Sequence, residues 1–209
     1  ATINRELAML SKAFSLAVRE WDWVKENPVS KVTKERENNR RDRWLTSEDE
    51  QMLLENSPQW LKEIIVFALH TGLRQDELLS LQWSRVDLFR KIIIIQESKN
   101  GKPRTIPLNR IALDILMEKA KLRNLKSDLV FLSNAITKIC CQNLIKAFNT
   151  ARDKASIQNL HWHSLRHSFA TRLAQRGIDL YKISKFLGHV SITMTQRYAH
   201  HCTESLREG

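Results

Sequence analysis

Glycine, proline, cysteine and long apolar runs are all scarce in this chain of 209 residues. With five glycines and four prolines, the chain is not of low complexity, and helix is favoured because both residues interrupt it. The three cysteines, Cys140, Cys141 and Cys202, are odd in number and form no C-x-x-C pair, which argues against a zinc site and a disulfide framework. This usage fits a reducing, cytoplasmic compartment. No apolar run approaches the roughly 18 residues of a membrane span, so no membrane partner is expected.

What the chain has in excess is positive charge. Lys and Arg number 34 against 23 Asp and Glu, which gives a formal net charge of +11 at pH 7. Lys and Arg neutralise phosphates and release condensed counterions, so this surplus indicates a polyanionic partner. A basic soluble protein without such a partner is the alternative that composition alone leaves open.

Apolar periodicity and charge divide the chain into three parts. Residues 2–21 have apolar side chains at steps of four and three, which predicts one helix with a single apolar stripe. A lone helix of this kind needs a partner, so we expect residues 1–30 to be the end of a longer helical domain. Residues 31–43 are mostly charged and predict a linker, either a solvated tether or an arm on a DNA backbone. Residues 44–209 form the second unit.

The second unit is predicted to be mostly α-helical with a small antiparallel β-hairpin, an α+β fold. Thr46 and Ser47 precede three acidic residues, which is typical of a capped helix start. Residues 91–107 change to strand-like composition around Asn100-Gly101, a strong hairpin turn signal. Helical patterns cover about 47–56, 59–70, 75–81, 109–121, 138–155, 162–176, 179–187 and 191–201.

The chain has only two tyrosines, and they differ in their surroundings. Tyr181 lies in an apolar pattern with Ile183 and Leu187, which predicts a buried ring. Tyr198 instead follows Arg197 and precedes two histidines. Because nearby cations favour the phenolate, Tyr198 is a candidate nucleophile, with an ordinary surface tyrosine as the alternative.

A basic helical face is the second candidate feature. His163 and Arg166 are three residues apart and share one face of a predicted helix, where they suit a phosphate. His163 and His167 also have the spacing of a helical metal pair, but no carboxylate or cysteine stands near them.

Two further charged positions fit the same chemistry. Arg74 begins a helix, and Glu77 three residues on can hold its guanidinium, although a plain surface ion pair is the alternative. Lys99 lies at the tip of the predicted hairpin, where it either solubilises the turn or enters a groove.

Together, the segments TGLRQDELLSL, ESKNGKPRTIPL, HSLRHSFATRLAQRG and LGHVSITMTQRYAH strongly resemble, in this order and spacing, the tyrosine recombinases, also called the phage integrase family. The resemblance covers residues 44–201, and residues 2–30 resemble the last helices of that family's core-binding domain. Position by position, it implies the catalytic residues Arg74, Lys99, His163, Arg166, His189 and Tyr198. It implies supporting roles for Glu77 and His167. Basic side chains expected on DNA are Arg40, Arg41, Arg43, Lys102, Arg104 and Arg172.

The resemblance implies a DNA strand transferase that needs no metal ion, no ATP and no other cofactor. Tyr198 would attack a scissile phosphate, form a 3′-phosphotyrosine and release a 5′-hydroxyl, and a 5′-hydroxyl of a partner strand would reverse the step. Arg74 and Arg166 would neutralise the charge that develops on the phosphate. Lys99 would protonate the leaving oxygen.

The two remaining histidines and the partners are implied in the same way. His163 would act as acid or base for the tyrosine, and His189 would donate a hydrogen bond to the phosphate. The implied partner is double-stranded DNA, with a monomer in its absence and a homotetramer on two synapsed duplexes. A directionality factor and a host DNA-bending protein would assist, in the nucleoid of a bacterial cytoplasm.

The expected role is integration or excision of a prophage or another mobile element. Alternatives are a chromosome-dimer-resolving recombinase and a type IB topoisomerase, which religates the same strand. A DNA-binding regulator without catalysis would explain the charge but not six separate catalytic positions. A metal-dependent nuclease would need clustered carboxylates that the sequence does not offer.

Overall fold

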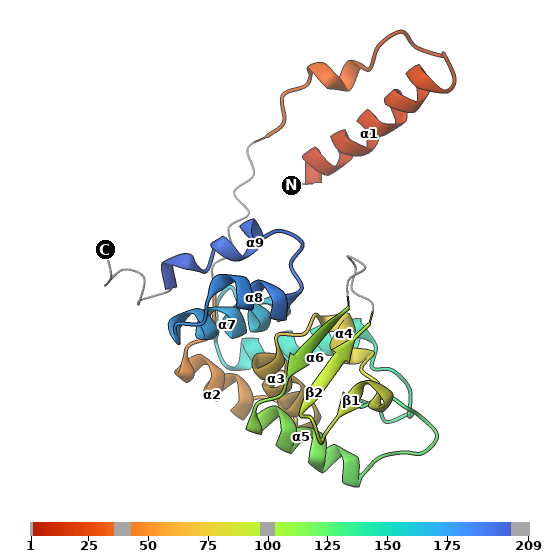
Figure 1. Cartoon of the computed structure of the whole chain (residues 1–209). Helices are drawn as coiled ribbons and strands as arrows, with labels where there is room; N and C mark the ends of the chain where they lie inside the picture. Colours follow the sequence, from red (N-terminus) through yellow and green to blue (C-terminus); the bar gives the residue numbers. More distant parts are fainter. Residues whose placement is uncertain (1, 36–42, 97–102, 202–209) are drawn as a thin grey trace. The chain divides into compact units, whose positions relative to one another are not determined.

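The computed structural model describes residues 2–35, 43–96 and 103–201, and the chain divides into two compact units, Ala1–Arg41 and Asp42–Gly209 (Figure 1). In the first unit, helix α1 (Thr2–Arg19) is followed by a short 3-10 helix (Pro28–Lys31). Asn27 joins the two, because its side-chain amide donates to the Ser11 carbonyl at 2.9 Å and its oxygen accepts from the Val29 backbone N–H at 3.0 Å. The assignment of residues 1–30 to a core-binding domain stays a prediction.

The second unit is mostly helical, as the sequence predicted. Its helices are α2 (Ser47–Glu55), α3 (Gln59–Thr71), α4 (Gln75–Leu79), α5 (Arg110–Lys121), α6 (Cys141–Lys154), α7 (Trp162–Gln175), α8 (Leu180–Leu187) and α9 (Thr193–Gln196). The predicted cap of α2 is present: the Thr46 hydroxyl accepts from the Asp49 backbone N–H at 3.1 Å, and Asp49 faces the Thr46 N–H in return. No described helix is long and apolar enough to span a bilayer.

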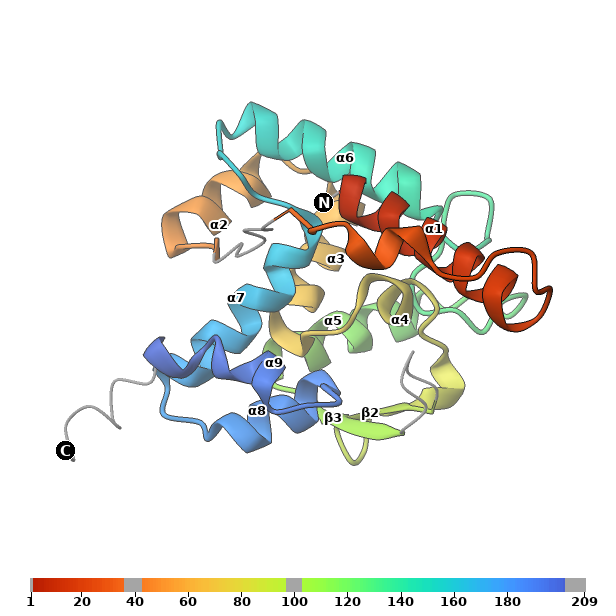
Figure 2. The ribbon, with the colours of Figure 1, turned by 90° about the horizontal axis from the view of Figure 1, so that it is seen from above.

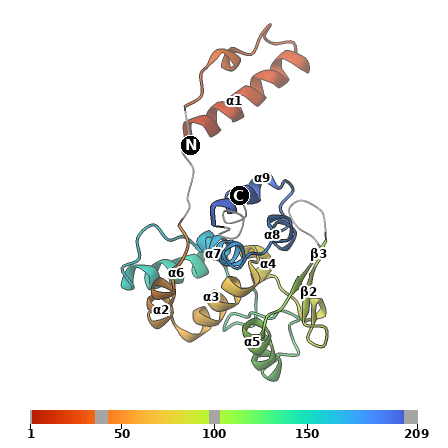
Figure 3. The ribbon, with the colours of Figure 1, turned by 60° about the vertical axis from the view of Figure 1, so that its left-hand side comes forward.

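A small antiparallel sheet lies at one side of the helices (Figure 3). Strands β1 (Val86–Asp87), β2 (Ile92–Ile95) and β3 (Arg104–Pro107) pair in that order, with Ile93 opposite Ile106 and Ile95 opposite Arg104. The predicted hairpin is therefore confirmed in β2 and β3. Strand β1 was not predicted, because its two residues are too few to carry a periodic signal.

The core that fixes the site lies around α3 and α7, which run side by side (Figure 2). Large apolar side chains such as Phe67, Phe131 and Phe148 are completely buried there. A smaller cluster of Ala170, Ala174, Ile183, Leu187 and Tyr198 joins α7, α8 and the last helical segment. This second cluster places the candidate nucleophile against the helix that carries the basic face.

The prediction of a buried Tyr181 is wrong. Its residue surface is 60% exposed, and Lys185 Nζ lies 4.8 Å from the centre of its ring. The buried face of α8 is defined by Ile183 and Leu187, which are four residues apart. Tyr181 lies two residues before Ile183, so the helix turns its side chain away from that face.

Candidate active site

Arg74 is placed by the sharp end of α3. Gly72 ends that helix with a φ of 62°, a left-handed conformation that suits glycine, and Arg74 then occupies the N-cap of α4. Glu77 accepts from the Arg74 backbone N–H at 2.8 Å and from its Nη1 at 2.9 Å. With 25% and 9% of their side chains exposed, the two residues form a half-buried pair and not a plain surface ion pair.

Arg104 reaches the same carboxylate from the sheet. Its Nη1 and Nη2 donate to the two oxygens of Glu77 at 2.9 and 2.6 Å, and its Nε donates to the Phe186 carbonyl at 3.1 Å. Only 7% of the side chain is exposed, which differs from the expected contact with DNA. The reason is strand alternation: Arg104 points to the same covered face as Ile106, which is 1% exposed.

The charge of Glu77 is stabilised by these two arginines. Burial alone would raise the pKa of this carboxyl, but hydrogen bonds and the charge of Arg104, together with hydrogen bonds from Arg74, lower the pKa to about 2. Glu77 is thus ionised at pH 7, and it holds both guanidinium groups.

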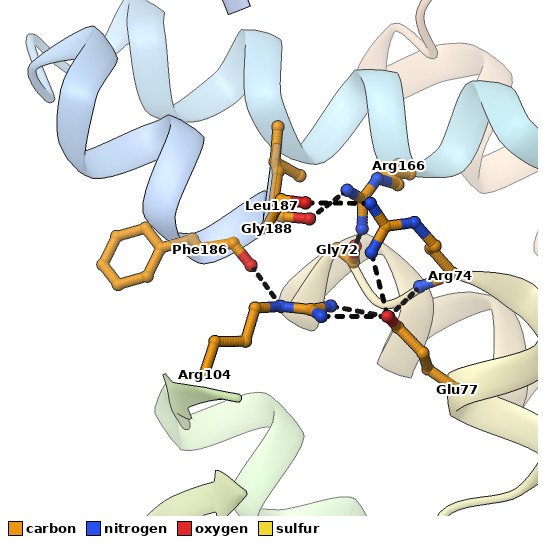
Figure 4. A network of polar contacts seen from close by, with 8 residues as sticks. All are labelled: Gly72, Arg74, Glu77, Arg104, Arg166, Phe186, Leu187 and Gly188. Carbon is orange, nitrogen blue, oxygen red and sulfur yellow. Dashed lines mark hydrogen bonds and ion pairs between the residues drawn. The ribbon is translucent and has the colours of Figure 1, made fainter. Parts of the chain in front are cut away.

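Arg166 enters the cluster from α7 and is 5% exposed (Figure 4). Its Nη1 donates to the Gly72 carbonyl at 2.7 Å, and its Nη2 donates to the Leu187 carbonyl. Arg74 Nη2 donates to the next carbonyl, that of Gly188, at 3.0 Å. Burial and then the neighbouring charge of Arg74 lower the pKa of Arg166 to about 9, so it remains charged at pH 7.

Tyr198 is held by the histidine face of α7. Its hydroxyl lies 2.6 Å from Nδ1 of His167, and the ring of His163 meets that of His167 edge-on at 4.7 Å. Tyr198 is 4% exposed, so the surface-tyrosine alternative is wrong. Although His163 is an exposed residue, partial desolvation by the surrounding protein, followed by the charges of Arg166 and Arg74, lowers its pKa. His163 is therefore neutral at pH 7.

His189 follows the left-handed Gly188, which ends α8 with a φ of 62°. Its Nδ1 lies 2.8 Å from the Thr195 hydroxyl, and Thr195 is completely buried. Desolvation, followed by the charges of Arg166 and Arg74, lowers the pKa of His189 to about 4. A Thr195 hydroxyl that donates to Nδ1 leaves the other ring nitrogen protonated, as a donor to a phosphate needs.

The remaining residues predicted to touch DNA are found in different settings. Arg172 is paired with Glu50 and also reaches the Leu45 carbonyl at 3.4 Å, with 24% of its side chain exposed. Arg43 is 40% exposed and pairs with Asp49 at 2.8 Å. Lys99, Lys102, Arg40 and Arg41 lie outside the described residues. Among the described residues, no three His, Cys, Asp or Glu side chains gather as a metal site.

The carbonyl acceptors at the end of α8 and the hydroxyl of Thr195 were not found from the sequence. A backbone carbonyl leaves no mark on composition or spacing, and only the sequence Leu187-Gly188, a helix end, hinted at free acceptors there. Thr195 did carry a weak signal, because it stands six residues after His189 in the same segment.

Comparison with known proteins agrees with this arrangement. The sequence model of the phage integrase family matches residues 43–205. The shufflon-specific DNA recombinase of Escherichia coli is 33% identical over 203 residues, covering 95% of this chain and 50% of that protein. The integrase of Salmonella phage P22 is 29% identical, over 100% of this chain and 57% of that protein. The chain thus spans about half the length of these curated relatives.

Tyrosine recombinase XerC of Halalkalibacterium halodurans is 30% identical and matches 100% of this chain and 74% of its own length. Among solved structures, XerA recombinase is similar with a TM-score of 0.68 and 27% identity, over 100% of this chain and 75% of that one. A lambda integrase dimer bound to a COC′ core site is similar with a TM-score of 0.77 and 25% identity, over 92% of this chain and 57% of that one. The fold, the site and these matches together show that the chain belongs to the phage integrase family, the tyrosine recombinases.

Proposed function

We propose that this chain carries the catalytic unit of a site-specific DNA recombinase that cleaves and rejoins DNA through a 3′-phosphotyrosine at Tyr198. The observation that carries the proposal is the placement of Arg74 and Arg166 on adjacent carbonyls, those of Gly188 and Leu187. Two guanidinium groups fixed side by side form an anion site, and His167, which follows Arg166 on α7, lies 2.6 Å from the Tyr198 hydroxyl.

The cleavage step follows from these positions. The Tyr198 oxygen bonds to the scissile phosphorus, the bond from phosphorus to the 5′-oxygen breaks, and the tyrosine proton passes to Nδ1 of His167. Arg74 and Arg166 neutralise the charge on the non-bridging oxygens, and Lys99 protonates the leaving 5′-oxygen. Attack by a 5′-hydroxyl of a second duplex runs the same step backward and joins new ends.

The neutral histidines suit this scheme. His163 lies against His167, and its neutral ring has a nitrogen lone pair that can accept a proton. His189 donates to the phosphate from the nitrogen that does not face Thr195. These assignments differ from the expected role of His163 in one respect: His167 is the first acceptor for the tyrosine proton.

Double-stranded DNA is the partner that the net charge of +11 and the two arginines support. Assembly as a homotetramer on two duplexes is supported by the similarity of fold to a lambda integrase tetramer bound to a Holliday junction, with a TM-score of 0.77. Action on a mobile element is supported by the named relatives, a shufflon recombinase and a phage integrase. A directionality factor and a host bending protein remain predictions.

Covalent trapping on a nicked duplex tests the proposal. The duplex carries the attachment site taken from the DNA that flanks the gene, and the nick lets the cleaved end diffuse away, so that the covalent complex accumulates. Wild type and Tyr181→Phe should give a protein–DNA band on a denaturing gel, and Tyr198→Phe should give none. Tyr181 is a matched control because it is the other tyrosine and is exposed. A band that survives in Tyr198→Phe would refute the assignment.

Strand exchange separates the remaining alternatives. A recombinase should join the cleaved strand to a second, labelled duplex, whereas a topoisomerase religates the original strand only. Tight binding with no covalent band in any variant would instead indicate a regulator.

A further inference from the structure

We propose that Arg104 is a positioning residue for the phosphate-binding arginines and acts through Glu77 and the C-terminal end of α8. The inference rests on the proposed function, since it concerns the same site. Arg104 belongs to β3, the strand that directly follows the segment carrying Lys99 and Lys102. It touches no position where a phosphate is proposed to bind, so any effect must pass through its partners.

Arg104 first acts on the orientation of the Glu77 carboxylate. Each oxygen of the Glu77 carboxylate accepts two hydrogen bonds, one from Arg74 and one from Arg104, at distances between 2.6 and 2.9 Å. A carboxylate offers about four lone-pair sites, so these contacts use its capacity fully. Glu77 therefore has no freedom to turn away from Arg74, and the paired guanidinium planes fix the direction in which Arg74 presents its charge.

The second link is electrostatic. Arg74 and Glu77 alone would form a neutral pair, which attracts a phosphate weakly. Arg104 supplies a second positive charge to Glu77, so that the cluster of Arg74, Arg104, Arg166 and Glu77 has a net charge of two positive units. With 7% of its side chain exposed, Arg104 acts where little water screens it. Loss of this charge halves the net charge that faces the phosphate.

The third link is the end of α8. The consecutive carbonyls of Phe186, Leu187 and Gly188 accept from Arg104, Arg166 and Arg74, in that order (Figure 4). The last carbonyls of a helix have no partner within the helix and carry the negative end of its dipole, so arginines are favourable there. Arg104 thereby fixes the corner from which His189 projects.

Gly188 makes this close approach possible. A Cβ at this position would lie 3.0 Å from Cδ of Arg104 and 3.1 Å from its Nη1, in addition to the strain of a φ of 62°. A side chain at residue 188 would therefore require Arg104 to shift by a few tenths of an ångström.

The test measures single-turnover formation of the covalent complex at saturating protein, together with DNA affinity at several salt concentrations. The variants are Arg104→Met, Arg104→Lys, Glu77→Gln and the double variant Arg104→Met/Glu77→Gln. Arg110→Met is the matched control, because Arg110 is an arginine of α5 whose side chain is 94% exposed.

We expect Arg104→Met to lower the cleavage rate by about 10- to 100-fold, as small displacements of catalytic groups do. The salt dependence of DNA affinity should match that of the Arg110→Met control, because Arg104 makes no phosphate contact, whereas the affinity itself should fall because the net charge at the site is halved. Arg104→Lys should recover part of the rate, because it keeps the charge but not the two-pronged contact. In the double variant, the loss should be smaller than the product of the two single losses, since both act through one contact.

Several results would overturn the inference. A wild-type cleavage rate in Arg104→Met would do so. So would lower affinity with a salt slope reduced by about one, because that marks a direct phosphate contact. Losses that multiply would mean that Arg104 and Glu77 act independently. If Arg104→Met does not fold, Arg104→Lys, which keeps the charge but not the two-pronged contact, must still cleave more slowly than wild type. Absence of cleavage by wild type would instead refute the proposed function.

Discussion

Removal of the hydrogen bond between Tyr198 and His167 tests how the nucleophile is activated, because the expected loss of cleavage rate differs between the two roles that His167 can have. His167 Nδ1 lies 2.6 Å from the tyrosine hydroxyl, and Tyr198 is 4% exposed. If the bond only orients the hydroxyl, its loss costs about 1 kcal/mol, which corresponds to roughly fivefold in rate. If His167 also accepts the proton during attack, the loss should be about 10²- to 10⁴-fold. The two roles are therefore separated by more than tenfold.

Two substitutions at one position distinguish them. In His167→Asn the amide oxygen falls near the position of Nδ1, so it can accept the hydrogen bond but cannot take up the proton at neutral pH. His167→Leu removes both abilities at similar volume. We expect both variants to lose about 10²- to 10⁴-fold in single-turnover cleavage. His167→Leu alone should also lose about 1 kcal/mol in the free energy of unfolding.

The assay is the rate of covalent complex formation on the nicked duplex, with unfolding followed by denaturant titration. His70→Leu serves as a control, because this histidine of α3 pairs with Asn109 and not with a residue of the site. If His167→Asn cleaves like wild type, the histidine orients the tyrosine and another group takes the proton. If His167→Leu also keeps wild-type cleavage and stability, the reasoning from this contact is refuted.

The pKa of His189 is lowered to about 4 and that of His163 is also lowered, so between pH 6.5 and about 4 the unfolded chain binds more protons than the folded one. The unfolding midpoint should thus fall as pH falls through this window, and His189→Asn should flatten the fall in a pH series of thermal scans. Arg166→Met should lower the rate of single-turnover cleavage at saturating protein by about 10²- to 10³-fold, and it should lower DNA affinity by a smaller factor. Gly188→Ala should cost about 1–2 kcal/mol in unfolding free energy, because a φ of 62° strains alanine and its Cβ meets Arg104; unchanged stability would contradict this.

Local signals in the sequence predicted most of the helices and the hairpin. The capped start of α2 depends on Thr46 and Asp49, which are three residues apart, and the glycine ends of α3 and α8 depend on single residues. The expected helix over 191–201 is instead α9 (Thr193–Gln196) and a short 3-10 helix (Ala199–His201). Periodicity could not show this break, because an α-helix and a 3-10 helix have nearly the same spacing over so few residues.

Some features of the site could likewise be predicted from local sequence patterns, whereas others depend on contacts between residues far apart in the chain. His163, Arg166 and His167 share one helical face, and that face could be predicted from their spacing. The hydrogen bond from Arg74 to Gly188 joins residues 114 apart in the chain, and no local pattern contains it. The resemblance to a known family supplied which distant positions belong together, but not the contacts between them. Arg104 illustrates the difference, because a basic residue beside a hairpin turn suggested DNA, whereas the fold turns it inward.

The end of α8 explains why distant segments of the sequence act as one site. Free carbonyls at a helix end must be satisfied, and here the donors are arginines from three other elements: α7, β3 and the start of α4. Each arginine donates some of its five N–H groups to a carbonyl or to Glu77 and is held in place by these hydrogen bonds. A displacement of α8 would therefore move Arg74 and Arg166 together with His189. The phosphate-binding charges and the corner that carries His189 are thus coupled, and a substitution in any one of these elements should affect the others through the carbonyls of Phe186, Leu187 and Gly188.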